Sequence, residues 1–171
     1  MELWDLYNEK REPLGIRHVR GEALPDGAYH IVVHVWIKNA SGQFLMSQRA
    51  ASRKSFPLMW ETVGGSVTAG EDSREGALRE VYEEIGIDLS ERDGRLVFSR
   101  VRGIVDSKRF NDILDVWLFE YNKDADLGSA TTDEVAQTKW LFPDEIKKLA
   151  DDGKLVCTLK YFFDKIQGEK I

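Results

Sequence analysis

The amino-acid sequence predicts an α+β fold in which helices pack on a mixed β-sheet. Two observations support this prediction. β-rich runs occur both before and after the strongest helical segment, Ser73–Ile85, so strands are expected on either side of that helix in the chain. In addition, the 171 residues are 42% hydrophobic and 11% aromatic, which is enough apolar material for one folded core. We therefore expect a single domain over residues 1–171.

The first half of the chain reads mainly as strands. Two short strands are expected around a turn at Glu9–Gly15. Residues His30–Ile37 and Gln43–Arg49 are rich in β-formers and are separated by the turn sequence KNASG, which predicts a hairpin. The following segment, AASRKSFPLMWE, is expected to be a loop because Pro57 opposes a helix there.

The helix at Ser73–Ile85 has both a start signal and a stop signal. Asp72 is a favourable N-cap, and Glu75, three residues later, completes a variant of the capping box. Gly86 is well placed to end the helix, because glycine readily takes the left-handed conformation found at helix C-termini.

The second half of the chain predicts strands followed by helices. Residues 95–105 and 113–122 alternate as paired strands do, and residues 135–142 form a further short strand. The sequence FPDEIKKLADDG predicts a short helix with Pro143 near its start. The tail, TLKYFFDKI, predicts a closing amphipathic helix.

Charge and cysteine content narrow the classes of partner. The formal net charge is −6, which argues against nucleic-acid polymers and anionic membranes but not against a small phosphorylated substrate bridged by a cation. Cys157 is the only cysteine, so an internal disulfide and a cysteine-based zinc cluster are excluded. The sequence shows neither a secretory signal nor a membrane-spanning run, and a cytoplasmic location is expected.

Three carboxylates share one face of the predicted helix. At 100° per residue, Glu84 and Glu83 fall about 40° and about 60° to either side of Glu80. Like charges at this spacing repel one another by roughly a few tenths of a kcal/mol per pair. A site for hard divalent cations would explain the crowding, and a solvated acidic face is the alternative. Gly64 and Gly65 would let the backbone approach an ion or a phosphate closely.

The same stretch matches the pattern G-x5-E-x7-R-E-U-x-E-E-x-G-U, in which U is a bulky aliphatic residue, without any departure. The matching residues are Gly65, Glu71, Arg79, Glu80, Val81, Glu83, Glu84, Gly86 and Ile87. With seven fixed letters at roughly 5–10% background each, a chance match is expected at about one start in 10⁸. The pattern is the Nudix signature, and the chain resembles a Nudix hydrolase.

This resemblance implies an α/β/α sandwich around a central mixed sheet, with a loop–helix–loop metal site. It also implies cleavage of a diphosphate linkage, usually in a nucleoside-diphosphate derivative, with Mg²⁺ or Mn²⁺. The residues that match the family's metal ligands are Glu80, Glu83 and Glu84, together with the carbonyl of Gly65. Glu71 matches a supporting position that is usually paired with the arginine, here Arg79. Cations suit this chemistry because they neutralise developing charge and lower the pKa of an attacking water.

Residues 29–87 also resemble the isopentenyl-diphosphate isomerase branch of the superfamily, through YHIVVHVWI and FLMSQRAASRKSFPLMW. Arg49 and Lys54 match basic residues that hold the diphosphate in those isomerases, and His30 matches a metal-binding histidine. His34 shares a strand face with His30 and is a candidate for substrate binding. The alternatives are ordinary surface cations and buried, hydrogen-bonded histidines.

The isomerase chemistry is not matched. Gly64 stands at the position of the isomerase catalytic cysteine, and Ser66 at that of a metal-binding histidine. Cys157 lies too far downstream to be carried over. Because the hydrolase signature is intact, the chain is interpreted as a pyrophosphohydrolase with an isomerase-like sequence, in which Gly64 supports the metal site.

Glu134 is a further candidate for catalysis. It begins a strand after a loop, in a region where many Nudix enzymes carry an additional acid as metal ligand or general base. A plain loop carboxylate is the alternative, and the general base is either Glu80 or Glu134. Phe56, Trp60 and Trp117 either stack on a base or belong to the core.

The expected function is metal-dependent hydrolysis of a small, nucleotide-type diphosphate compound by a monomer or homodimer. An isopentenyl-diphosphate isomerase and a catalytically silent Nudix binding module are the alternatives. The silent module is disfavoured because such modules typically lose glutamates of the signature. The identity of the substrate and the choice between Mg²⁺ and Mn²⁺ stay open.

Overall fold

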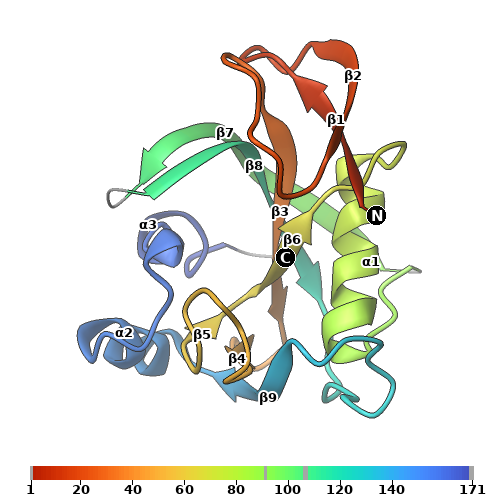
Figure 1. The fold of residues 1–171 in the computed structure, drawn as a ribbon. Helices are drawn as coiled ribbons and strands as arrows, with labels where there is room; N and C mark the ends of the chain where they lie inside the picture. The colour runs from red at the N-terminus through yellow and green to blue at the C-terminus, as the bar shows by residue number, and fades with distance from the viewer. Residues whose placement is uncertain (1, 91, 106–107, 170–171) are drawn as a thin grey trace.

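The structure is a computed structural model that describes residues 2–90, 92–105 and 108–169. A seven-stranded mixed sheet forms its centre, with helices on both faces (Figure 1). Helix α1 (Ser73–Ile85) covers one face, while α2 (Pro143–Asp151) and α3 (Phe162–Lys165) lie on the other. The predicted α+β sandwich is thereby confirmed. Among the described residues, no helix is long and apolar enough to cross a membrane.

The sheet combines parallel and antiparallel pairs. Its strands are β3 (His30–Lys38), β4 (Phe44–Arg49), β5 (Trp60–Glu61), β6 (Val63–Ser66), β7 (Gly94–Val105), β8 (Lys108–Glu120) and β9 (Val135–Leu141). The order is β5-β4-β3-β8-β7, with β6 paired to β3 and β9 paired to β4. Strands β3 and β8 are parallel, and every other pair described is antiparallel. A separate hairpin of β1 (Leu3–Tyr7) and β2 (Pro13–Val19) stands at one end of the molecule (Figure 1).

The two faces of the sheet make two cores. Alternate residues of β3 point to opposite faces, and its residues Val33 and Val35 join the core that Val81 of α1 completes. Trp36, on the other face, packs against Phe162 of α3. His30 and His34 alternate with the α1-facing residues and therefore lie on the α3 side.

Helix α1 has the predicted bounds and the predicted caps. The Asp72 carboxylate accepts from the backbone N–H of Glu75, and the Glu75 carboxylate accepts from the backbone N–H of Asp72, both at 2.8 Å. Gly86 ends the helix in the left-handed conformation, with φ of 67°. These local signals decide the position of the helix that carries the carboxylates.

Two predicted turns differ in detail. The first turn spans residues 8–12, because β2 already begins at Pro13, so the expected turn at Glu9–Gly15 was placed too late. The β3–β4 hairpin is present, but its register contains only the pair Lys38 and Phe44. Beyond that pair the strands separate, because β3 pairs with β6 and β8 while β4 pairs with β9 and β5.

The prediction of one continuous closing helix over residues 158–166 is wrong. A 3₁₀ turn, Cys157–Leu159, precedes the short α3. The amphipathic character is present, since Leu159, Phe162 and Ile166 are buried in the second core. Long-range contacts decide the conformation here: the Tyr161 hydroxyl bonds to two side chains of β3, and aromatic residues have modest helix propensity.

Candidate active site

Arg79 connects the acidic face of α1 to the loop before it. Its guanidinium pairs with both carboxylate oxygens of Glu71, at 2.8 and 3.1 Å. It also contacts Glu80 at 2.9 Å and Glu83 at 3.0 Å, and donates to the carbonyl of Ser66. The repulsion among the helix carboxylates is therefore offset in part by a side chain of the same helix.

Gly65 leaves room for the Glu80 carboxylate. A Cβ added at this position would overlap all three atoms of that group. The missing side chain thus keeps Glu80 against the backbone of β6. At Gly64, an added Cβ would overlap the backbone carbonyl oxygen of Val33, so this position is closed to a cysteine unless β3 and β6 move apart.

Glu84 is the most enclosed carboxylate of the signature and is 6% exposed. Burial raises its pKa well above the usual value, and the nearby carboxylates of Glu61, Glu80 and Glu134 raise it further. Burial also raises the pKa of Glu80 and of Glu61. Glu61, Glu80 and Glu134, from β5, α1 and the segment before β9, thus lie close enough to Glu84 to disfavour its charge.

Arginines engage most of these carboxylates. Glu61 pairs with Arg49, and Glu134 pairs with Arg53 at 2.6 Å. As the side chains stand, no three His, Cys, Asp or Glu residues within the described ranges converge closely enough to hold a metal ion. The donor set itself consists of carboxylate oxygens, which suit a hard divalent cation, and crowded buried carboxylates are the groups that such an ion would relieve.

Backbone bonds fix Glu134 beside α1. The carbonyl of Glu83 accepts from the backbone N–H groups of Thr131 and Thr132, at 2.9 and 3.1 Å. The carbonyl of Glu134 in turn accepts from the backbone N–H of Ala50. These bonds tie the β8–β9 loop to the end of α1 and to the end of β4, and so bring Glu134 next to the basic loop that follows β4.

A pocket of about 480 Å³ opens at this junction. Its lining includes Arg49 at the end of β4, Arg53 and Lys54 of the loop that follows, and Glu134. We name it the basic pocket. The resemblance-based candidates Arg49 and Lys54 are thus brought together with Glu134, at the edge of the carboxylate cluster.

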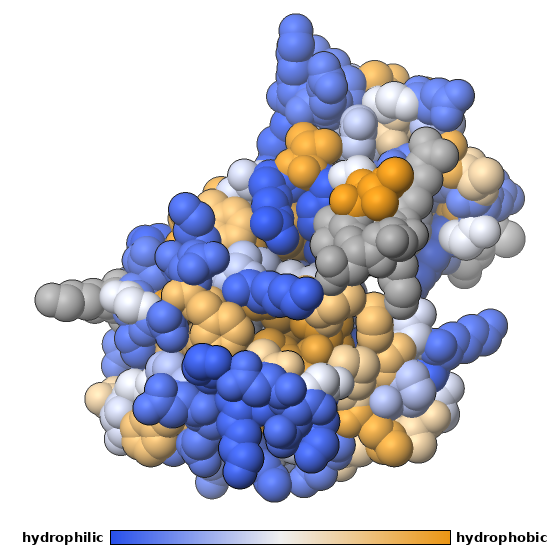
Figure 2. All heavy atoms as spheres, turned by 90° about the vertical axis from the view of Figure 1, so that its left-hand side faces the viewer, coloured by the Kyte–Doolittle hydropathy of each residue, from blue (hydrophilic) through white to orange (hydrophobic). Residues whose placement is uncertain are grey.

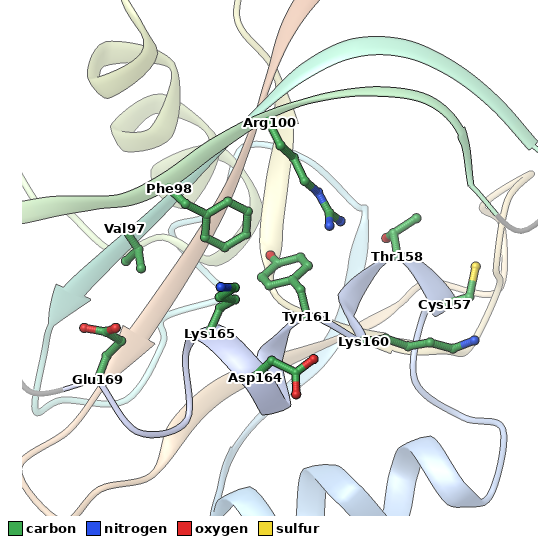
Figure 3. Close-up of a pocket in the computed structure, with 10 residues that line it drawn as sticks. All are labelled: Val97, Phe98, Arg100, Cys157, Thr158, Lys160, Tyr161, Asp164, Lys165 and Glu169. Atoms are coloured by element: carbon green, nitrogen blue, oxygen red, sulfur yellow. The ribbon is translucent and has the colours of Figure 1, made fainter.

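Two more pockets continue the basic pocket along the face opposite α1. The middle pocket, about 360 Å³, shares Arg49 and Ser55 with the basic pocket and includes His34 and Arg102. The aromatic pocket, about 880 Å³, shares Thr158 with the middle pocket. In Figure 3, Arg100 reaches down over Tyr161 while Phe98 lies beside it. Figure 2, viewed from the α3 side, shows apolar surface in a recess between hydrophilic regions above and below.

Several functional candidates carried no sequence signal. Glu61, Arg53 and Arg102 lie outside the signature, and only the folding of β5, the β4–β5 loop and β7 brings them to the site.

The three aromatic residues that were candidates for base stacking lie in different parts of the structure. Trp117 faces α1 and donates its Nε1–H to the Ser73 hydroxyl at 2.9 Å. Trp60 belongs to the second core. Phe56 lines the middle pocket. It is the one of the three that borders the groove formed by the basic, middle and aromatic pockets.

Comparisons with known proteins agree on one family. A family model described as NUDIX domain matches residues 28–159. An uncharacterized Nudix hydrolase of Listeria monocytogenes is 36% identical over 166 residues, covering 95% of this chain and 91% of that protein. An isopentenyl-diphosphate Delta-isomerase of Shigella flexneri is 29% identical over 109 residues, covering 60% of each chain.

Two solved structures show the likeness of fold. A crystal structure from Deinococcus radiodurans has a TM-score of 0.72 at 22% identity, covering 91% of this chain and 93% of that one. A bifunctional NMN adenylyltransferase/ADP ribose pyrophosphatase of Francisella tularensis, complexed with AMP and a Mn ion, has a TM-score of 0.58 at 18% identity. It covers 80% of this chain and 41% of that one.

Proposed function

The chain belongs to the Nudix hydrolase family, and we propose that it hydrolyses a diphosphate linkage in a small nucleotide-type substrate with the help of Mg²⁺ or Mn²⁺. The observation that carries this proposal is the buried carboxylate of Glu84, which Glu61, Glu80 and Glu134 surround closely enough to disfavour its charge. A cluster of this kind is stabilised by a cation, and a diphosphate requires one for its own charge.

Glu80, Glu83, Glu84 and the carbonyl of Gly65 would hold the cation, with Glu134 and Glu61 at its border. When bound, the cation would neutralise charge on the phosphates and make water a better nucleophile. Gly65 keeps Glu80 in place, because any side chain there would displace its carboxylate. The proton released by the water goes to one of the two candidate bases, Glu80 or Glu134.

The arginines of the basic pocket would hold the diphosphate. Arg49 and Arg53 are paired with Glu61 and Glu134, the acids that border the proposed metal site. Once cations take up the negative charge of these acids, both guanidinium groups become available for phosphate oxygens, which they bind in bidentate fashion. Lys54 lines the same pocket and adds a third positive charge.

The nucleotide-type substrate is supported by the size and chemistry of the groove. Phe98 and Tyr161 line the aromatic pocket, and aromatic side chains make favourable contacts with flat aromatic groups. The Francisella tularensis neighbour, complexed with AMP and a Mn ion, carries ligands of this class, although that likeness is one of fold alone.

A substrate screen tests the proposal. Nucleoside di- and triphosphates, sugar nucleotides and dinucleotides are incubated with the full chain and Mg²⁺ or Mn²⁺, and released phosphate or monophosphate is measured. We expect hydrolysis of at least one class, lost in excess chelator and restored by the metal. Full turnover in excess chelator, or a complete lack of turnover across the panel, would contradict it.

A further inference from the structure

Arg102 is a buried cation with an incomplete set of partners. Its Nε and Nη2 pair with the two oxygens of Asp112, at 2.6 and 2.7 Å, and the two side chains are 4% and 3% exposed. Its Nη1 has no hydrogen-bond partner among the described residues. An unsatisfied donor on a buried charged group is costly and rare in native proteins, so a ligand that completes it is worth seeking.

The middle pocket is the space that Arg102 borders. Arg102 on β7 is in register with Asp112 on β8, which is in register with His30 on β3. These side chains lie on the face opposite α1. His34, four residues further along β3 and on the same face, lines the middle pocket. The pocket is therefore built on three adjacent strands of the sheet.

His34 presents a donor to this pocket. Trp36 Nε1–H donates to the Tyr161 hydroxyl oxygen at 3.0 Å, and that hydroxyl lies 2.8 Å from His34 Nδ1. Burial lowers the pKa of His34 well below its usual value, so the ring is neutral and has one acceptor nitrogen. With the Tyr161 O–H donating to Nδ1, the ring proton would lie on Nε2. His34 Nε2 has no partner among the described residues.

The remaining polar groups of the lining also favour an anion. Arg49 and the Thr158 hydroxyl add donors, and Glu61, the one carboxylate lining the pocket, is paired with Arg49. Arg100 lies next to the pocket, over the Tyr161 ring at 5.3 Å, and Figure 3 shows its guanidinium directed toward Tyr161 and Thr158. No carboxylate within the described residues forms an ion pair with Arg100.

We propose that the middle pocket binds an anionic group, a phosphate or a carboxylate, that the substrate carries beyond the hydrolysed diphosphate. Arg102 and His34 are its specificity-determining residues. This inference rests on the proposed function, in which the adjoining basic pocket holds the diphosphate itself. The shared wall of Arg49 and Ser55 places the two anions side by side in one groove.

Matched substrate pairs test this specificity. Coenzyme A differs from dephospho-coenzyme A by one phosphate, and UDP-glucuronate differs from UDP-glucose by one carboxylate. For the wild-type chain we expect kcat/KM at least tenfold higher for the anionic member of one pair, and the pair that shows it tells phosphate from carboxylate. Equal values within both pairs would overturn the proposal.

Two variants locate the effect. Arg102→Gln combined with Asp112→Asn removes both buried charges and leaves two amides that can hydrogen-bond to each other. His34→Phe keeps the ring volume and removes the donor. In both, we expect the preference to fall at least fivefold, mainly through a higher KM for the anionic member. Arg95→Gln, on the same strand but outside the pocket, is the control. Equal losses on both members would show that Arg102 serves only the diphosphate or the fold.

A binding measurement separates this inference from the proposed function. The melting temperature of the full chain is recorded in chelator with inorganic phosphate and, separately, acetate. We expect one of these anions to raise the melting temperature of wild type and of Arg95→Gln, but not of His34→Phe or the double variant. If this holds while no substrate is hydrolysed, the proposed function fails and the anion pocket stands. If neither anion has an Arg102-dependent effect, the anion pocket is wrong.

Discussion

At the scale of single residues, charge compensation at the site comes from arginines as well as from any bound cation. The sequence predicts that Glu80, Glu83 and Glu84 share one helix face and that a positive charge offsets their repulsion. Arg79 supplies that charge to Glu80 and Glu83. Glu84 has no ion pair among the described residues and is the most buried of the three. It therefore has the most to gain from a divalent ion.

The first prediction concerns the signature glutamates. Replacing Glu80 or Glu84 by Gln keeps the shape of the side chain and removes a charge that a hard cation requires. We expect hydrolysis to fall by about 10²-fold or more, on the order of 3 kcal/mol in transition-state stabilisation. The metal-free Glu84→Gln variant should melt no lower than wild type, because repulsion among carboxylates is relieved, whereas Glu80→Gln also loses its ion pair with Arg79. Turnover and melting temperature are the measurements.

Glu75→Gln is the matched control, since it lies on the same helix but forms the capping box with Asp72. Glutamine can still accept the Asp72 N–H bond, so this variant should keep wild-type turnover. If the control loses activity while Glu84→Gln keeps it, the wrong face of α1 has been assigned to catalysis.

The second prediction concerns His30 and acid stability. Burial lowers the pKa of His30 to about 4, and its ring stacks on Trp4. Between that value and the usual 6.5, the unfolded chain binds the proton and the folded chain does not, so stability is lost as pH falls through this window. His30→Phe keeps the stacking and removes the titration. Its free energy of unfolding should decline less than that of wild type between pH 6.5 and 4, by an amount on the order of 3 kcal/mol. Parallel urea-unfolding profiles for the two proteins would contradict this.

At the scale of elements, the sequence predicts best where the signals are local. Helix α1 has its predicted bounds because Asp72, Glu75 and Gly86 set them within one segment. The tail is less predictable, because Tyr161 is held by His34 and Trp36, more than 120 residues earlier in the chain. The same difference applies to the residues of the site. The spacing of Glu80 and Glu84 along one helix predicts that they lie together. Glu61 and Arg102 are brought to the site by strand pairing, which residue spacing does not predict.

The third prediction contrasts the two glycines of β6. In Gly65→Ala the new Cβ meets the end of the flexible Glu80 side chain, so the carboxylate should move while the strand stays. We expect activity to fall tenfold or more, with little change in the melting temperature. In Gly64→Ala the Cβ meets the backbone of Val33, and the β3–β6 pair must shift. That variant should lose roughly 2 kcal/mol of stability. The opposite ranking of the two melting temperatures would refute the geometry.

At the scale of the whole molecule, the β1–β2 hairpin is joined to the sheet rather than independent of it. Arg11 pairs with the buried Asp115 of β8 at 2.6 Å, and Tyr7 and Tyr29 exchange two backbone hydrogen bonds. We accordingly propose that the single domain expected from the sequence includes this hairpin, although the family model begins at residue 28.

The last prediction decides between the hydrolase and the isomerase within one fold. Relatives of both kinds match this chain, so overall resemblance does not separate the two activities, and the site must. An isomerase of this branch would need a cysteine at Gly64 and a histidine at Ser66. Here position 64 is closed by Val33, and the Ser66 carbonyl is bound to Arg79. With isopentenyl diphosphate and Mg²⁺, we expect no dimethylallyl isomer from wild type, and none from Gly64→Cys, because the added side chain would separate β3 from β6 instead of entering the groove. Formation of that isomer by wild type at a catalytic rate, measured by product chromatography, would overturn the hydrolase assignment of this site.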